Sequence, residues 1–276
     1  MQLPFVKMHG LGNDFIVFDE PTDAPLPDAD TLRAWGDRHR GIGFDQALVL
    51  SPPRQPGTAV YYRIFNSDGQ EVEQCGNGAR CVAALVARRL GLGPGELTMD
   101  SPAGLVHARL TSDGQVAVRM AVPNFHPAAL PFTASAEAAF YPLEAGGTVV
   151  DIGAVSIGNP HAVLRVPSVK TAPVDRLGPA IENHPRFPRR TNVGFMEVVD
   201  RGHIRLRVHE RGAGETLACG TGACGAVAVG RRHGLLEATV RVDLPGGTLV
   251  VRWEGEGQPI WLTGPATTVF EGSISA

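Results

Sequence analysis

Two cysteines stand in the same glycine-rich setting at two places in the chain. One run reads Cys75-Gly76-Asn77-Gly78, and the other reads Cys219-Gly220-Thr221-Gly222. Small apolar residues follow each run, which predicts a buried helix beginning directly after each cysteine. The first turn of a helix has backbone N–H groups without partners and a partial positive charge, so it can bind a carboxylate. A cysteine placed there is expected to have a stabilised thiolate.

A thiolate and a thiol on opposite faces of one carbon atom could remove a proton from one face and return a proton to the other. Two neighbouring thiols resist ionising together, so one thiolate and one thiol is the expected state of the pair. Without an electron sink such as pyridoxal phosphate, oriented backbone dipoles in a cleft closed to water would have to stabilise the carbanion. The sequence contains no dinucleotide or Walker fingerprint, and we expect no cofactor.

The two cysteines occupy equivalent positions in an internal repeat. Residues 66–89 and 210–233 share the frame E-x-x-x-C-G-x-G-A, with the cysteines 144 residues apart. Shorter matches on both sides of this frame pair Gly12-Asn13 with Gly158-Asn159 and residues 100–104 with 243–247. We therefore expect two copies of one domain, with the second beginning near residue 121. The low-complexity stretch 126–139 is interpreted as marking the transition.

Each copy is expected to be several short strands around one helix. Alternating or β-branched patterns predict strands over 60–65, 105–110, 116–120, 204–208 and 249–253. Further helices are expected near 30–38 and 174–183. The predicted class is α+β, with two pseudo-twofold-related domains, each a mostly antiparallel sheet or barrel wrapped around a central buried helix. In that arrangement both cysteines would face one cleft.

Polar residues at equivalent positions of the two copies are candidates for substrate binding. The pairs are Asn13 and Asn159, Gln46 and Asn192, and Asn66 and Glu210. Each residue alone would be read as a turn or cap residue, but their equivalence favours binding. Glu210 and Arg211 form an opposite-charge pair suited to an amino group and a carboxylate. His161 could adjust the protonation of a thiol, although a lone histidine is more often structural.

The remaining cysteines, Cys81 and Cys224, are interpreted as packing residues, because cysteine is among the most often buried residue types. A zinc site is disfavoured, because the spacings C-x5-C and C-x4-C lack the usual C-x2-C knuckle. The net charge of −3 suggests neither a nucleic-acid partner nor an anionic membrane surface. The first ten residues lack the apolar core of a signal peptide, so we expect a cytoplasmic protein with its four cysteines as thiols.

Five motifs resemble those of the diaminopimelate epimerase family, and the resemblance covers essentially the whole chain. The motifs are residues 7–15, 66–69 with 75–80, 158–161, 190–193 and 210–224. The resemblance implies interconversion of LL- and meso-2,6-diaminopimelate, on the bacterial route to lysine and peptidoglycan. Cys75 and Cys219 are then the acid–base pair, assisted by His161 and Glu210.

The family's site residues can be carried over to matching positions. Backbone groups at Gly76-Asn77 and Gly220-Thr221 would hold the reacting carboxylate. The resemblance implies that the rest of the site is lined by Asn13, Gln46, Asn66, Asn159, Asn192, Glu210 and Arg211. It also implies a homodimer without cofactor or metal, and domains made of residues 1–120 plus 265–276, carrying Cys75, and 121–264, carrying Cys219. Phe270 departs from the family, which often has tyrosine at this dimer contact.

The same residues are compatible with three other functions. One alternative is a proline-racemase-like or phenazine-isomerase-like enzyme of the same general fold, although the phenazine type lacks the paired cysteines. A second is a thiol hydrolase with Cys75 as nucleophile and His161 as base, which leaves Cys219 unexplained. A third is a non-catalytic amino-acid binding module.

Overall fold

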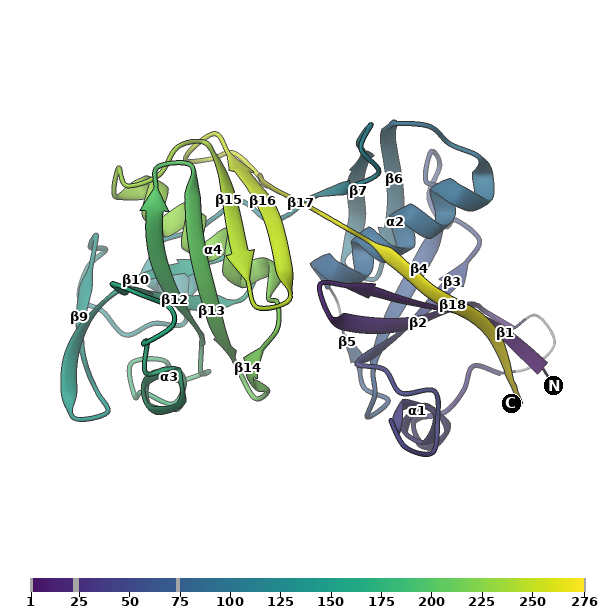
Figure 1. Cartoon of the computed structure of the whole chain (residues 1–276), viewed down its shortest axis with the longest axis horizontal. Helices are drawn as coiled ribbons and strands as arrows, with labels where there is room; N and C mark the ends of the chain where they lie inside the picture. Colours follow the sequence, from purple (N-terminus) through teal and green to yellow (C-terminus); the bar gives the residue numbers. More distant parts are fainter. Residues whose placement is uncertain (1, 22–24, 73–74, 276) are drawn as a thin grey trace. The chain divides into compact units, whose positions relative to one another are not determined.

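The computed structural model describes residues 2–21, 25–72 and 75–275. The chain divides into two compact units, labelled by their elements in Figure 1. Unit 1 comprises Met1–Val118 and Gly264–Ala276, and unit 2 comprises Arg119–Thr263. In the part of the chain that is described, no helix is both long and apolar enough to cross a membrane.

Unit 1 is a sheet of short strands with two helices. Its elements are β1 (Gln2–Gly10), β2 (Asn13–Asp19), α1 (Ala29–Gly36), β3 (Gln46–Ser51), β4 (Tyr61–Asn66), β5 (Glu71–Val72), α2 (Gly76–Leu90), β6 (Gly95–Ser101), β7 (Gly104–Leu110), β8 (Val116–Arg119) and β18 (Thr267–Ser275). Strand pairing is antiparallel except between β2 and β3 and between β4 and β6.

Unit 2 begins with a 3-10 helix and one strand, and its remaining elements follow the same order of strands and helices as β1 to β8 of unit 1. The elements of unit 2 are η1 (Pro127–Ala129), β9 (Tyr141–Ala145), β10 (Thr148–Ser156), β11 (Pro160–Arg165), α3 (Val174–Glu182), β12 (Asn192–Asp200), β13 (His203–Glu210), β14 (Gly214–Thr216), α4 (Gly220–Arg232), β15 (Thr239–Leu244), β16 (Gly247–Trp253) and β17 (Ile260–Gly264). Its parallel pairs are β11 with β12 and β13 with β15. These pairs occupy the same places in the strand order as the parallel pairs of unit 1. The predicted α+β class, with mostly antiparallel pairing, is confirmed.

The helices α2 and α4 supply much of the core of their units. Val82 and Ala83 of α2 and Ala226 and Val227 of α4 are fully buried. A helix that is apolar on most of its surface is stable only when strands cover it, because each buried apolar side chain contributes roughly 1.5–3 kcal/mol. The sheet of each unit therefore fixes the position of one helix start, and with it one of the repeated cysteines.

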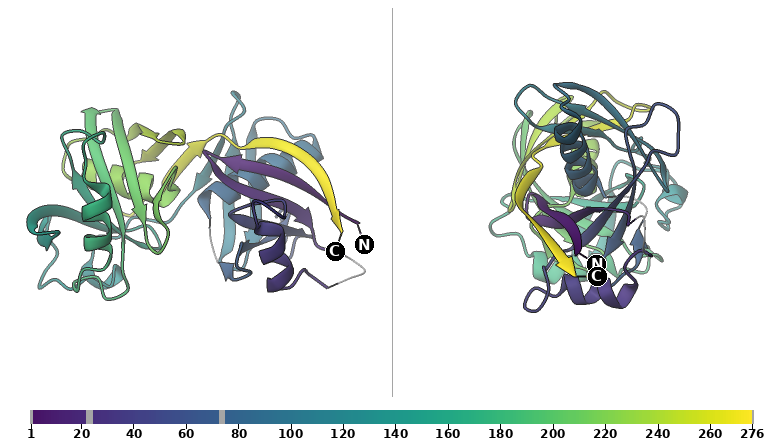
Figure 2. Two further views of the ribbon diagram at one scale, coloured as in Figure 1. Left: turned by 60° about the horizontal axis from the view of Figure 1, so that its bottom comes forward. Right: turned by 90° about the vertical axis from the view of Figure 1, so that its right-hand side faces the viewer.

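The last strand of the chain belongs to unit 1. β18 pairs antiparallel with β1 from Gln2 opposite Ser275 to His9 opposite Thr267, with one bulge. Figure 2 shows the C-terminal strand in yellow running beside the purple N-terminal strand. Arg88 at the end of α2 adds an ion pair of 2.7 Å to Glu271 of β18.

The segment 126–139, which was predicted to mark the transition between the two copies, lies inside unit 2, which begins at Arg119. Leu130 and Phe132 of this segment are buried in the core of unit 2. The ring of Phe132 packs 4.6 Å from Phe187 and 4.8 Å from Tyr141, measured between ring centroids. Leu130 and Phe132 were not predicted as core residues, because the alanine- and proline-rich sequence around them has no strand or helix periodicity.

A glycine in β10, Gly153, packs closely against Val229 of helix α4. A Cβ atom added at Gly153 would lie 2.4 Å from Cγ1 of Val229. We therefore expect Gly153→Ala to lower the free energy of unfolding by about 1–3 kcal/mol, because the helix must shift. Denaturant unfolding followed by circular dichroism measures this. Gly93→Ala is the matched control, because no atom lies within 4 Å of its added Cβ, and equal effects at both positions would contradict the prediction.

Candidate active site

Cys75 lies where the sequence predicts, at the residue before the first turn of α2. It is the N-cap of this helix, and its sulfur accepts a hydrogen bond from the backbone N–H of Gly78 at 3.4 Å. The thiol is half-buried. A sulfur that receives a backbone N–H at a helix start is placed to carry negative charge.

Asn13 lies beside this sulfur. It is the first residue of β2 and follows the turn Leu11-Gly12, in which both residues have positive φ, 58° and 88°. Such a two-residue turn matches the twist of the strands that it joins. The Asn13 side-chain oxygen Oδ1 is 3.7 Å from the sulfur of Cys75 and 3.2 Å from the amide nitrogen of Asn77.

Gln46 and Asn66 face each other across the antiparallel pair β3–β4. Nε2 of Gln46 donates to Oδ1 of Asn66 at 2.9 Å. The other polar atom of Gln46, Oε1, is buried and has no hydrogen-bond partner among the described residues. A buried acceptor without a partner costs free energy, so it is suited to accept an N–H from a ligand.

Cys219 has the equivalent position before α4 in unit 2, with a different environment. Only 4% of its surface is exposed, and its sulfur lies 3.6 Å from the hydroxyl of Thr221. Burial raises the pKa of the Cys219 thiol well above its ordinary value, and the carboxylate of Glu210 raises it further. The backbone N–H of Gly222 at the helix start lowers this pKa, but burial and the negative charge of Glu210 outweigh it.

Asn159 and His161 extend the contacts of Thr221. Nδ2 of Asn159 donates to the Thr221 hydroxyl at 3.3 Å, and Oδ1 of Asn159 lies 3.0 Å from Nε2 of His161. Burial, together with the charge of Arg211, lowers the pKa of His161 to about 3. The imidazole is therefore neutral at physiological pH and can donate one hydrogen bond to Asn159.

Asn192, Glu210 and Arg211 lie together at the ends of β12 and β13. Oδ1 of Asn192 accepts the backbone N–H of Arg211 at 3.0 Å, and its Nδ2 donates to the carbonyl of Pro160 at 3.1 Å. Asn192 thus holds the backbone that carries Arg211. The Thr216 hydroxyl donates to the carboxylate of Glu210 at 2.6 Å. The fold brings these three residues together, and Asn192 positions Arg211 through its backbone N–H.

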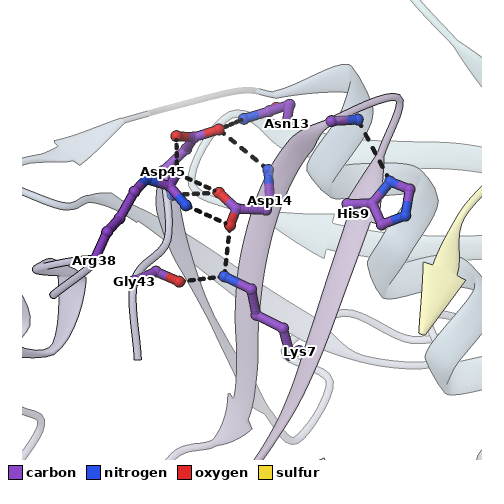
Figure 3. Close-up of polar contacts among 8 residues, drawn as sticks. Lys7, His9, Asn13, Asp14, Arg38, Gly43 and Asp45 are labelled. Carbon is purple, nitrogen blue, oxygen red and sulfur yellow. Dashed lines mark hydrogen bonds and ion pairs between the residues drawn. The ribbon is translucent and has the colours of Figure 1, made fainter. Parts of the chain in front are cut away.

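The structure also contains polar groups next to the site that sequence reasoning missed. Figure 3 shows Lys7, Asp14, Arg38 and Asp45 joined by ion pairs in unit 1. Burial alone would raise the pKa of Asp14, but hydrogen bonds from Arg38 and Lys7 lower it to about 2. The acidic residues directly after Asn13 and directly before Gln46 were the available signal.

A second missed group supports the loop after β13. The carboxylate of Glu182 is 2.8 Å from Nε2 of His209, accepts the backbone N–H of Gly212 at 2.8 Å, and lies 3.1 Å from Arg190. Glu182 and His209 are buried. This network fixes the backbone on both sides of Glu210 and Arg211. The helix near 174–183 was predicted, but nothing in its pattern distinguished Glu182 from a surface glutamate.

Each unit therefore carries a candidate site of the same design. A cysteine precedes a buried helix, and an asparagine from a β-hairpin contacts Cys75 in unit 1 and Thr221, next to Cys219, in unit 2. The four cysteines form no disulfide. Among residues 2–21, 25–72 and 75–275, no cluster of three His, Cys, Asp or Glu side chains is placed to hold a metal ion. A thiol at a helix start, where the partial positive charge favours anions, is suited to proton transfer.

Solved structures of other proteins share this fold. A phenazine biosynthesis protein of the PhzF family from Bacillus anthracis matches with a TM-score of 0.72 and 17% identity, covering 100% of both chains. A probable proline racemase from Agrobacterium radiobacter K84 matches with a TM-score of 0.70 and 18% identity, covering 99% of this chain and 93% of that chain. At these identities the likeness establishes the fold.

Sequence relatives narrow the assignment. A protein of Thioalkalivibrio sulfidiphilus named diaminopimelate epimerase is 55% identical over 99% of each chain. A diaminopimelate epimerase of Stutzerimonas stutzeri is 53% identical over 99% of each chain. The family model for diaminopimelate epimerase matches residues 5–126 and 153–269. The chain belongs to the diaminopimelate epimerase family.

Proposed function

We propose that this protein interconverts LL-2,6-diaminopimelate and meso-2,6-diaminopimelate by proton transfer at one α-carbon, in the biosynthesis of lysine and of peptidoglycan precursors. The observation that carries the proposal is the pair of equivalent half-sites, Cys75 at the start of α2 and Cys219 at the start of α4. Relatives with more than half of their residues identical over nearly the whole chain carry the name of this activity.

The two thiols act as acid and base on opposite faces of the α-carbon. A thiolate takes the α-proton, and the thiol of the other cysteine delivers a proton to the opposite face. The N–H groups of Gly76-Asn77 and Gly220-Thr221 hold the carboxylate of the reacting centre, which spreads the negative charge of the carbanion. Because burial and Glu210 raise the pKa of Cys219, that cysteine holds its proton in the ligand-free state.

The remaining polar groups recognise the amino groups and the second carboxylate. Gln46, with its buried partnerless oxygen, and Asn66 accept from an ammonium group. Glu210 pairs with an amino group, and Arg211, held by Asn192, binds a carboxylate. Asn13 and Asn159 line the site next to the sulfurs. His161, neutral at physiological pH, assists Cys219 by orienting Asn159 toward Thr221.

We also propose that the enzyme is a cytoplasmic homodimer that needs neither cofactor nor metal. The face of β18 supports the dimer, because Val269 and Phe270 are 55% and 47% exposed. Phe270 also packs edge-to-face on Phe5 at 5.8 Å between ring centroids. Exposed apolar residues on an edge strand are typical of a protein contact.

The test is an assay of the purified protein on LL-diaminopimelate in D2O, with no cofactor or metal added. We expect the meso isomer to form with deuterium at the inverted α-carbon, because the thiol that returns the proton exchanges with solvent. Proton NMR of the α-position measures this.

Two outcomes would contradict the proposal. Inversion of proline without turnover of diaminopimelate would favour a proline-racemase-like enzyme. Binding of diaminopimelate without any exchange of the α-hydrogen would favour a binding module.

A further inference from the structure

An ion-pair cluster outside the substrate-contacting groups ends on the side chain of Asn13. Arg38 donates to both oxygens of Asp14, at 2.8 and 2.9 Å, and to Oδ1 of Asp45 at 2.7 Å. Lys7, itself buried, lies 2.6 Å from Asp14. The second oxygen of Asp45 accepts from Nδ2 of Asn13 at 2.9 Å and from the backbone N–H of Asp14 at 3.1 Å. Figure 3 shows these contacts converging on Asp45.

The contacts of Asn13 form a hydrogen-bonded chain with a defined direction. Arg80, fully buried, donates to Oδ1 of Asn77 at 2.9 Å. Nδ2 of Asn77 then donates to Oδ1 of Asn13, and Nδ2 of Asn13 donates to Asp45. A guanidinium can only donate and an ionised carboxylate can only accept. Arg80 at one end of this hydrogen-bonded series and Asp45 at the other therefore determine the orientation of the side-chain amides of Asn77 and Asn13.

The direction of these hydrogen bonds determines which atom of the Asn13 amide faces the sulfur of Cys75. With Nδ2 turned to Asp45, the carbonyl oxygen of Asn13 faces the sulfur at 3.7 Å. An acceptor stabilises the thiol, whereas the opposite orientation would present an N–H₂ group and stabilise the thiolate. The N–H of Gly78, at 3.4 Å, favours the thiolate from the other side. The amide of Asn13 thus balances the effect of the helix start.

Unit 2 has the reverse arrangement at the equivalent asparagine. There Nδ2 of Asn159 donates toward Thr221, the hydroxyl next to Cys219, and Oδ1 of Asn159 faces His161. The orientation of this asparagine is therefore set separately in each unit by the neighbouring charged or polar group, and the shared fold alone does not determine it.

We infer that Asp45 is a positioning residue that fixes the amide of Asn13 so that its carbonyl oxygen faces the sulfur of Cys75. Arg38 and the N–H of Asp14 hold the Asp45 carboxylate in place, and Lys7 holds Asp14. Asp45 acts through Asn13 and tunes how readily Cys75 gives up its proton. The inference rests on the proposed acid–base role of Cys75.

The experiment measures the pKa of Cys75 directly, without turnover. The rate of alkylation by iodoacetamide is followed against pH, and the peptide that contains Cys75 is quantified by mass spectrometry. Asp45→Asn should lower the pKa of Cys75 by roughly one unit, because the amide of Asn13 is released to turn its N–H₂ group toward the sulfur. Asp30→Asn is the control for the Asp-to-Asn change, because the side chain of Asp30 is 86% exposed and pairs with Arg33 on the same helix. It should leave the pKa unchanged.

Cys81 and Tyr62 are titratable groups that interact with the sulfur of Cys75. Burial raises the pKa of Cys81 to about 12, and burial followed by the charge of Cys75 raises the pKa of Tyr62. Both keep their protons over the range of the experiment. Arg80, Arg38 and Asp14 keep their charges over the same range.

A double-mutant cycle separates positioning from the loss of the Asp45 charge. If Asp45 acts through Asn13, Asp45→Asn should shift the pKa of Cys75 by only a few tenths of a unit, roughly, in an Asn13→Ala background. Asp45→Ser, the second variant, should show the same dependence on Asn13. Equal shifts with and without Asn13, or no shift in either background, would overturn the inference. Wild-type protein that alkylates normally but does not epimerise diaminopimelate would instead refute the proposed function alone.

Discussion

Replacing Cys75 or Cys219 by alanine should lower the rate of epimerisation of diaminopimelate by roughly 10³-fold or more, because each direction of the reaction needs one thiol as base and the other as acid. The fold should survive, because alanine fits the N-cap backbone and the contacts of the Cys75 sulfur with Gly78 and Asn13 are long, at 3.4 and 3.7 Å. A coupled assay in both directions, with circular dichroism as the check on folding, measures this.

Cys81 and Cys224 provide matched controls on the same two helices. Both are fully buried, and burial raises the pKa of Cys81 to about 12, so its thiol cannot serve as a base at neutral pH. Alanine at either position should leave turnover close to that of the wild type and cost about 1 kcal/mol of unfolding free energy through a small cavity. Near-normal turnover in Cys75→Ala or Cys219→Ala would refute the two-base assignment.

Glu182→Ala should lower the free energy of unfolding by about 3 kcal/mol, because it leaves His209 and the N–H of Gly212 buried without their partner. Denaturant unfolding at pH 7 measures the loss. Affinity for diaminopimelate should fall as well, since the loop that carries Arg211 loses its anchor.

The control for this substitution is Glu237→Ala, at an ion pair of 3.9 Å whose carboxylate is 63% exposed. It should change stability by no more than about 0.5 kcal/mol.

The stabilisation by Glu182 should also depend on pH. Burial alone would raise the pKa of Glu182, but hydrogen bonds from His209 and Gly212 lower it. The contribution of Glu182 to the free energy of unfolding is therefore complete above the pKa of glutamate in the unfolded chain. It is lost as the pH falls through the lower pKa that Glu182 has in the folded protein. A variant as stable as the wild type at pH 7 would show that the network contributes little.

The repeat made the main elements of this protein predictable from sequence. The C-G-x-G runs before apolar stretches located both helix starts, and strands predicted at 105–110 and 249–253 correspond to β7 and β16 within two residues. Helix starts and strands depend on short-range sequence patterns, and the repeat shows each of these patterns twice in this chain. The equivalence of Asn13 with Asn159 also indicated residues that lie beside the two cysteines.

Contacts between distant segments were beyond sequence reasoning. Asp45, which Arg38 holds, reaches Asn13 because β2 and β3 pair in parallel, with Phe15 opposite Gln46. The raised pKa of Cys219 depends on how completely strands cover α4, which periodicity does not measure. Leu130 and Phe132 were missed because their segment has no regular structure, so no period marks its buried positions.

The pairing of β18 with β1 has a consequence for the nascent chain. β1 is translated before the residues of unit 2, and its partner, Thr267–Ser275, is translated after them. Residues 119–263 can therefore fold while one edge of β1 is still unpaired. An unpaired strand edge can pair with other chains, so unit 1 is exposed to such pairing during this interval.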